Sequence, residues 1–271
     1  MTAFREVAVL RLTPDDITPA SRSLPIEAPI AIEYNGISYA VMMATPDQLE
    51  DFVTGFSLSE RIIASIDELE DIDIYETEKG WIVRVALAQH RFEPMLNRVR
   101  VRVSESSCGL CGMENLEQLA TPLPPIEARV DVAPQALFSA LASLRAHQPL
   151  SAMTGGAHVA AFCAPNGEIL DAREDVGRHC ALDKLIGHLL RTGVDAGSGY
   201  FTITSRCSFE MLEKVAAFGA RTVKGAGTPG RRLGSTSHGQ LAINDTTVHS
   251  SNTAAMSRLR HSAGRCRGRS V

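Results

Sequence analysis

The chain has 271 residues, of which 44% are hydrophobic and 21% are charged, and its formal net charge at pH 7 is -4. This composition is typical of a soluble globular protein with one large domain or two modest ones, and the charge provides no general attraction to nucleic acid or anionic membranes. We expect no membrane span, because nowhere do about 18 apolar residues run together. The first residues lack the basic and apolar regions of a secretion signal, so we expect a cytoplasmic protein.

Strand patterns dominate the first hundred residues. Five short stretches with apolar or alternating character occur at residues 30–34, 37–42, 72–75, 81–87 and 98–103. Asn35 and Gly36 separate the first two stretches, and these residue types tolerate the positive φ angles of a two-residue hairpin turn. In the last stretch arginine and valine alternate strictly, as in a half-buried strand. We therefore expect a β-rich N-terminal subdomain over residues 1–103.

One helix is predicted inside this subdomain. Thr45 is suited to its N-cap, Pro46 to its first turn, and Gln48 to the position of a capping-box partner. Apolar residues then repeat at helical spacing along one face, at Leu49, Phe52, Val53 and Phe56.

The chain changes character after residue 103. Residues 104–125 are rich in small residues and contain three prolines near their end, which predicts a mobile connection with a short helix at 114–119. This connection carries Cys108 and Cys111, separated by Gly-Leu.

Helical and strand patterns alternate over residues 126–223, which predicts an α/β core. The expected helices lie at residues 134–144, 182–190 and 209–218, the last with Ser208 as N-cap and Gly219 as its stop. The expected strands lie at residues 158–164, 168–172 and 200–204.

The last part of the chain, residues 224–271, is an atypical basic tail. No Phe, Tyr or Trp follows Gly219, and a segment of this composition does not bury enough apolar surface to order itself. We hypothesise that the abrupt loss of apolar periodicity reflects a frameshift in the source gene. Resequencing the codons for residues 219–226 tests this, because an intact reading frame excludes it.

The Cys108–Cys111 pair is the strongest chemical signal. Six cysteines occur in the chain, and Cys163, Cys180, Cys207 and Cys266 stand singly. Thiolate is the reactive form of cysteine, and two thiols three residues apart can carry a sulfur atom as a persulfide or close as a disulfide.

Other interpretations of the pair remain open. A structural zinc site needs four ligands, and no second CxxC or HxxxH is present to supply the other two. The pair also fits a dithiol oxidoreductase, or two loop cysteines without a role. A zinc deaminase is excluded, because no histidine has Glu two residues later and Ser107, not Pro, precedes Cys108. We expect no metal site.

Two further segments are dense in glycine and polar residues. The first contains Thr154, Gly155 and His158, and the second contains Arg178 and His179 directly before the helix expected at 182–190. Backbone N–H groups at that helix start, with the two basic side chains, could hold an anionic group such as phosphate. The alternative is structural: hydrogen-bonded histidines, with Glu174 and Asp175 capping the helix.

Taken in order, five segments resemble the FdhD family of formate dehydrogenase accessory sulfurtransferases. They are residues 45–60, 106–112, 154–158, 173–184 and 204–211, and the resemblance covers residues 30–223. It implies a mixed α/β protein whose core is a cytidine-deaminase-like α/β/α layer without zinc, and a homodimer. By this resemblance Cys108 carries the persulfide and Cys111 is its partner.

The resemblance also implies a substrate and partners. Members of the family accept sulfur from a cysteine desulfurase and pass it to the molybdenum bis(molybdopterin guanine dinucleotide) cofactor of formate dehydrogenase. A glycine- and arginine-containing segment near the family's C-terminal end contacts that dinucleotide, and it is not found here. The weak candidates for cofactor binding are therefore Thr154, Gly155, His158, Arg178 and His179. A non-enzymatic cofactor-binding chaperone and an inactive frameshifted copy remain as alternatives.

Overall fold

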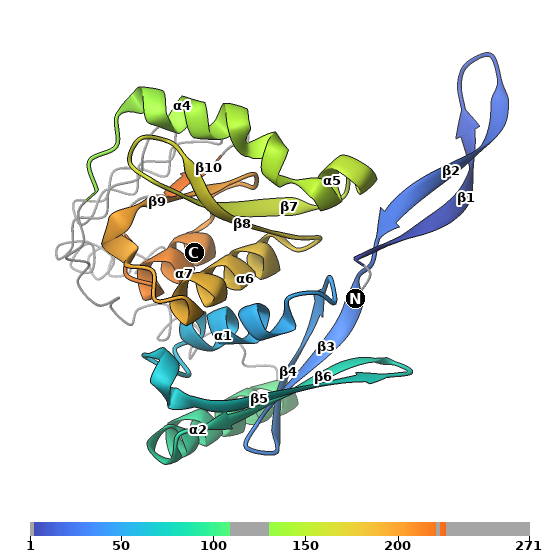
Figure 1. The fold of residues 1–271 in the computed structure, drawn as a ribbon. Coiled ribbons are helices and arrows are strands. Elements are labelled where there is room, and N and C mark those ends of the chain that lie inside the picture. The colour runs from blue at the N-terminus through green and yellow to red at the C-terminus, as the bar shows by residue number, and fades with distance from the viewer. Residues whose placement is uncertain (1–2, 109–129, 221–222, 226–271) are drawn as a thin grey trace, which may run out of the picture.

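A computed structural model describes residues 3–108, 130–220 and 223–225 of the chain (Figure 1). The strands are β1 (Phe4–Leu12), β2 (Ile17–Pro25), β3 (Ala28–Tyr34), β4 (Ile37–Ala44), β5 (Leu69–Thr77), β6 (Gly80–Leu87), β7 (His158–Cys163), β8 (Ile169–Asp175), β9 (Tyr200–Ile203) and β10 (Val223–Gly225). The α-helices are α1 (Leu49–Ser59), α2 (Gln89–Cys108), α4 (Pro134–Ser143), α5 (Pro149–Thr154), α6 (Arg178–Arg191) and α7 (Phe209–Ala217). Short 3-10 helices are η1 (Ile66–Glu68), η2 (Leu144–His147) and η3 (Ala196–Ser198). No helix within these ranges is long and apolar enough to cross a membrane.

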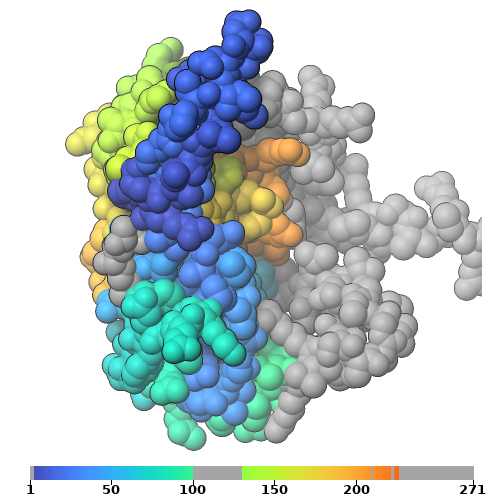
Figure 2. Space-filling view, turned by 90° about the vertical axis from the view of Figure 1, so that its right-hand side faces the viewer, coloured from blue at the N-terminus to red at the C-terminus, as the bar shows by residue number. Residues whose placement is uncertain are grey.

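The N-terminal part forms a four-stranded sheet and a separate hairpin. The sheet has the order β4-β3-β6-β5, and the predicted turn joins β3 to β4, with φ angles of 48° at Asn35 and 79° at Gly36. Strands β1 and β2 pair only with each other within the described residues. Figure 2 shows this hairpin projecting beyond the rest of the molecule.

The second sheet has the order β10-β9-β7-β8. Strand β7 is antiparallel to both β8 and β9, whereas β10 is parallel to β9. Side chains on β7 alternate between the two faces: Val159 and Ala161 pack with α4, whereas Ala160 and Phe162 belong to the main core with α6 and α7. The sheet therefore has helices on both faces, and the expected mixed α/β class is confirmed.

Helices α1, α6 and α7 form a layer between the two sheets (Figure 1). One continuous buried cluster includes Ile32 of β3, Phe52 of α1, Leu185 of α6 and Phe201 of β9. Because the cluster joins residues from the first sheet to residues from the second, the two sheets share one core.

The strand predicted at residues 98–103 is wrong, because these residues lie inside α2. An apolar stripe of α2 packs on the main core at helical spacing, with Phe92, Met95 and Val99. Met95 is only 1% exposed. Burial of this helical stripe outweighs the local alternation of arginine and valine. Residues 104–108, predicted as part of the mobile connection, continue the same helix.

The predicted start of α1 is also wrong. The helix begins at Leu49 after Gln48, which has φ 49° and makes no side-chain cap. Thr45 instead points to the other half of the molecule: its backbone N–H donates to Asp175 at 3.0 Å, and its hydroxyl accepts from the N–H of Val176 at 3.3 Å. A tertiary contact has replaced the local capping box.

Smaller differences occur near the C-terminal half of the fold. Pro134 begins α4 as predicted, and Phe138 of this helix is 60% exposed. Ser208 precedes α7 without a side-chain cap, whereas Gly219 follows it with the left-handed φ of 90°. Strand β10 extends to Gly225, two residues into the predicted tail. The helix expected at 114–119 and the tail from residue 226 lie outside the described residues.

Candidate functional site

Cys108 is the last residue of α2. Its side chain and the whole of Cys111 lie outside the described residues, so the structure gives no geometry for the CxxC pair. The assignment of these two residues as the reactive thiols remains a prediction.

The three cysteines that are described are all buried. Burial raises the pKa of the Cys163 thiol above its usual range, and burial raises the pKa of Cys180 and Cys207 to about 12. Thiols of this kind are protonated at neutral pH and are poor nucleophiles. The remaining candidates for a reactive thiol are therefore Cys108, Cys111 and Cys266.

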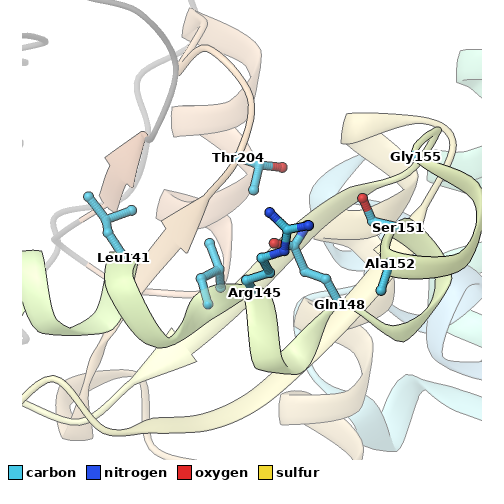
Figure 3. Close-up of a pocket in the computed structure, with 8 residues that line it drawn as sticks. Leu141, Arg145, Gln148, Ser151, Ala152, Gly155 and Thr204 are labelled. Carbon is cyan, nitrogen blue, oxygen red and sulfur yellow. The ribbon is translucent and has the colours of Figure 1, made fainter.

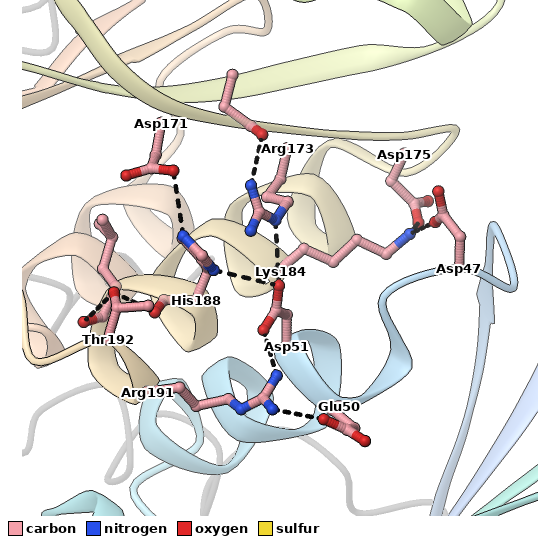
Figure 4. A network of polar contacts seen from close by, with 12 residues as sticks. Asp47, Glu50, Asp51, Asp171, Arg173, Asp175, Lys184, His188, Arg191 and Thr192 are labelled. Carbon is pink, nitrogen blue, oxygen red and sulfur yellow. Dashed lines mark hydrogen bonds and ion pairs between the residues drawn. The ribbon is translucent and has the colours of Figure 1, made fainter.

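The polar segment before α6 is used mainly to hold the fold together (Figure 4). Asp175 and Lys184 are both fully buried and form an ion pair at 2.8 Å. Asp175 also accepts the N–H of Gly177 at 2.8 Å, and the Lys184 ammonium donates to the carbonyl of Thr45 at 3.0 Å and to Asp47. This cluster fastens the loop before α1 to the start of α6.

A second set of ion pairs joins α1 to β8 and α6. Asp51 accepts from Arg173 at 3.1 Å and from Arg191 at 2.6 Å, and it lies 3.6 Å from a ring nitrogen of His188. On the other side of α6, buried Asp183 accepts two 2.8 Å hydrogen bonds from Lys214 of α7. Much of the charge in residues 173–184 is thus structural.

The predicted capping of α6 by Glu174 is wrong. Its carboxylate accepts the N–H groups of Leu150 at 2.7 Å and Ser151 at 2.8 Å, at the start of α5. Thr154, at the end of the same helix, is buried and donates its hydroxyl to the carbonyl of Leu150 at 2.7 Å. Gly155 follows with a left-handed φ of 68°. Both Thr154 and Gly155 therefore have a structural role in ending α5.

His158 and Arg178 lie at one edge of the second sheet. His158 begins β7 directly opposite Asp175, the last residue of β8, and Arg178 begins α6 three residues later. Burial and then the charge of Arg178 lower the pKa of His158, so the two basic groups are close enough to interact. The Arg178 side chain is exposed and has no hydrogen bond or ion pair with any described residue.

His179 follows Arg178 and has a carboxylate within ion-pair distance. Its ring nitrogen Nε2 lies 3.2 Å from the carboxylate of Glu210 on α7. Burial and the charges of Arg178 and Lys214 lower its pKa. Of the predicted anion-binding residues, the structure brings His158 and Arg178 together and leaves His179 paired to a carboxylate.

A pocket of about 540 Å³ lies next to this sheet edge, between η2, α5 and the residue that follows β9 (Figure 3). Its lining includes Arg145, Gln148, Ser151, Gly155 and Thr204. Gly155 was among the predicted residues, but Arg145 and Gln148 were not, because they lie between two helices with no recognisable motif. In the sequence, nothing about Arg145 and Gln148 indicates a binding site; only the fold places them beside Thr204.

Comparison with known proteins settles the family. The FdhD/NarQ family model matches residues 25–231. The chain belongs to the FdhD/NarQ family. A sulfur carrier protein FdhD from Cupriavidus necator is 40% identical over 220 residues, which are 81% of this chain and 74% of that protein. Another from Acinetobacter baylyi is 43% identical over 195 residues, which are 70% of each chain.

A solved structure supports the fold. A crystal structure described as a formate dehydrogenase accessory protein from Desulfotalea psychrophila superimposes with a TM-score of 0.64, covering 84% of this chain and 86% of that one at 21% sequence identity. The match with the FdhD/NarQ family extends past the resemblance of residues 30–223 at both ends. It starts at residue 25, the last residue of β2, and reaches residue 231. It therefore passes residues 219–226, whose codons are the place of the hypothesised frameshift.

Proposed function

We propose that this chain is a sulfurtransferase that carries sulfur as a persulfide on Cys108. Its relatives in the FdhD/NarQ family are named sulfur carrier proteins, which supports a sulfur-transfer role. The observation that carries the residue assignment is the burial of Cys163, Cys180 and Cys207 with raised thiol pKa values. It leaves the CxxC pair, Cys108 and Cys111, as the close pair of cysteines able to react.

The first step is a thiol–persulfide exchange. The Cys108 thiolate attacks the outer sulfur of a persulfide on a cysteine desulfurase; a new S–S bond forms on Cys108, and the desulfurase cysteine leaves as a thiolate. The oxidation state of the transferred sulfur does not change in this step. No external oxidant or reductant is required.

The second step releases the sulfur for transfer to the molybdenum bis(molybdopterin guanine dinucleotide) cofactor, which is the substrate of the reaction. If Cys111 attacks the inner sulfur of the Cys108 persulfide, a Cys108–Cys111 disulfide forms and the outer sulfur leaves as hydrosulfide. The two thiols then supply the two electrons that reduce the sulfur. A dithiol reductant returns the disulfide to the starting state.

The acceptor carries phosphate groups, and the edge of the second sheet is suited to anions. His158 and Arg178 are close enough for the charge of Arg178 to affect His158, and the Arg178 side chain has no partner within the described part of the chain. We therefore propose that this edge faces the cofactor, in a cytoplasmic homodimer that serves formate dehydrogenase.

The same unpaired Arg178 side chain favours a second candidate function, a cofactor-binding chaperone that carries no sulfur. Activation of formate dehydrogenase in a lysate from cells lacking the endogenous carrier distinguishes the two. A sulfur carrier loses activation in Cys108→Ala, whereas a chaperone keeps it even in Cys108→Ala/Cys111→Ala. Failure of the wild-type chain to activate, although folded, indicates an inactive copy and contradicts both functions.

A further inference from the structure

The pocket beside the second sheet contains polar side chains that the protein itself does not use. The Arg145 side chain makes no hydrogen bond or ion pair with any described residue, and the same holds for the side chains of Gln148 and Ser151. Thr204 differs, because its hydroxyl accepts the N–H of Val159 at 3.0 Å. In Figure 3 the Arg145 guanidinium lies between Gln148 and Thr204, amid the lining side chains.

Five other arginines of the described residues have carboxylate partners. Arg61, Arg84, Arg91, Arg173 and Arg191 all form ion pairs with carboxylates. A guanidinium that lines a pocket without a carboxylate partner is available to a ligand, and its planar donor groups match the oxygens of phosphate.

The surroundings of the pocket add positive charge. Arg22 of β2 reaches its rim, since its Nη2 atom lies 3.6 Å from the position that a Cβ would take on Gly155. The charged side chain of Arg178 lies at the neighbouring sheet edge, next to His158. The nearby Glu174 carboxylate is 8% exposed and accepts two backbone N–H groups of α5, one of them that of Ser151; it is not among the residues that line the pocket.

The size and the remaining walls indicate more than a bare ion. About 540 Å³ is within the range of small-molecule sites, and Leu141, Leu144 and Ala152 give the pocket an apolar side. We propose that this pocket binds a phosphorylated small molecule, with Arg145 holding a phosphate and Gln148 and Ser151 donating to it. This deepens the proposed function. The binding of a phosphorylated molecule does not depend on that function; only the identification of the molecule with the acceptor cofactor rests on it.

The test is isothermal titration of the full chain with inorganic pyrophosphate at about 0.15 M salt, where exposed charges are screened beyond about 8 Å. Wild type is expected to bind, and Arg145→Gln to bind about tenfold more weakly, as for the loss of a charge-assisted contact. Arg84→Gln is the matched control: it removes the same charge from an exposed ion pair with Glu33, and is expected to bind within twofold of wild type. Thermal melting shows that both variants are folded.

Three results would overturn the proposal: no binding of pyrophosphate by folded wild type, equal weakening by Arg145→Gln and Arg84→Gln, or equally tight binding of succinate, which would indicate a carboxylate site. Sulfur loading of wild type is measured separately. Pyrophosphate binding without sulfur uptake supports the phosphate pocket and contradicts the proposed sulfur carrier. Sulfur uptake without pyrophosphate binding supports the carrier and contradicts the pocket.

Discussion

Gly55 of α1 lies against Gly187 of α6 so closely that the two helices touch through their backbones. A Cβ on Gly55 would lie 1.8 Å from the carbonyl oxygen of Asp183, and a Cβ on Gly187 would lie 1.9 Å from that of Asp51. This approach is what brings the carboxylate of Asp51 within reach of Arg191. The contact between these helices therefore positions the N-terminal sheet on the α/β core.

We expect Gly187→Ala to destabilise the protein strongly. The added methyl group overlaps backbone atoms that cannot move aside singly, and overpacking of this kind costs on the order of 3 kcal/mol. Gly193→Ala serves as the control, because Gly193 has a left-handed φ of 69° but open space around it, and the backbone strain costs about 1 kcal/mol. Urea unfolding measures both, and equal costs would contradict the close helix contact.

The buried ion pair of Asp175 and Lys184 gives a second prediction. Removing one partner leaves the other charge buried without compensation, so Lys184→Met and Asp175→Asn are each expected to cost about 3–5 kcal/mol of unfolding free energy. The double variant should cost clearly less than the sum, in a double-mutant cycle from urea unfolding. The exposed pair of Arg84 and Glu33 is the comparison, with a much smaller expected coupling because solvent screens it. A buried coupling no larger than the exposed one would show that Lys184 is not held by Asp175.

The elements predicted correctly are those whose signal is local. The turn at Asn35 and Gly36 requires positive φ angles that these residue types tolerate, and the apolar stripe of α6 has the helical period throughout. The errors arise where a distant partner decides. Thr45 was predicted to cap α1 but contacts Asp175, 130 residues away, and the stretch at 98–103 alternates locally but is helical because Met95 and its neighbours pack on the core.

The buried thiols give a prediction on pH dependence. With a pKa of about 12 for Cys180 and Cys207, the thiolate fraction at pH 9 is only about one thousandth, whereas an ordinary thiol of pKa about 8.5 is mostly ionised there. Raising the pH from 7 to 9 is therefore expected to leave both unlabelled by iodoacetamide in the folded chain. Both become labelled in urea. Peptide mass mapping checks this, and fast labelling of either residue in the folded protein would contradict their burial.

The candidate site was less predictable than the fold. Charged residues between 173 and 184 suggested an anion site, but the sequence does not show that Asp175, Asp183 and Lys184 form buried pairs with residues of other elements. Arg145 was missed for the opposite reason, because an exposed arginine without a motif is indistinguishable in sequence from a solvated one. Its significance comes only from the pocket that surrounds it.

The central claim is that Cys108 carries the sulfur. Its most direct test is intact-mass spectrometry after incubation with a cysteine desulfurase and cysteine, comparing wild type with Cys108→Ala, Cys111→Ala and the control Cys266→Ala. We predict a gain of about 32 Da, one sulfur atom held as a persulfide, in wild type and in Cys266→Ala, and its loss in Cys108→Ala. Uptake of sulfur by folded Cys108→Ala, or no uptake by folded wild type, would contradict the claim.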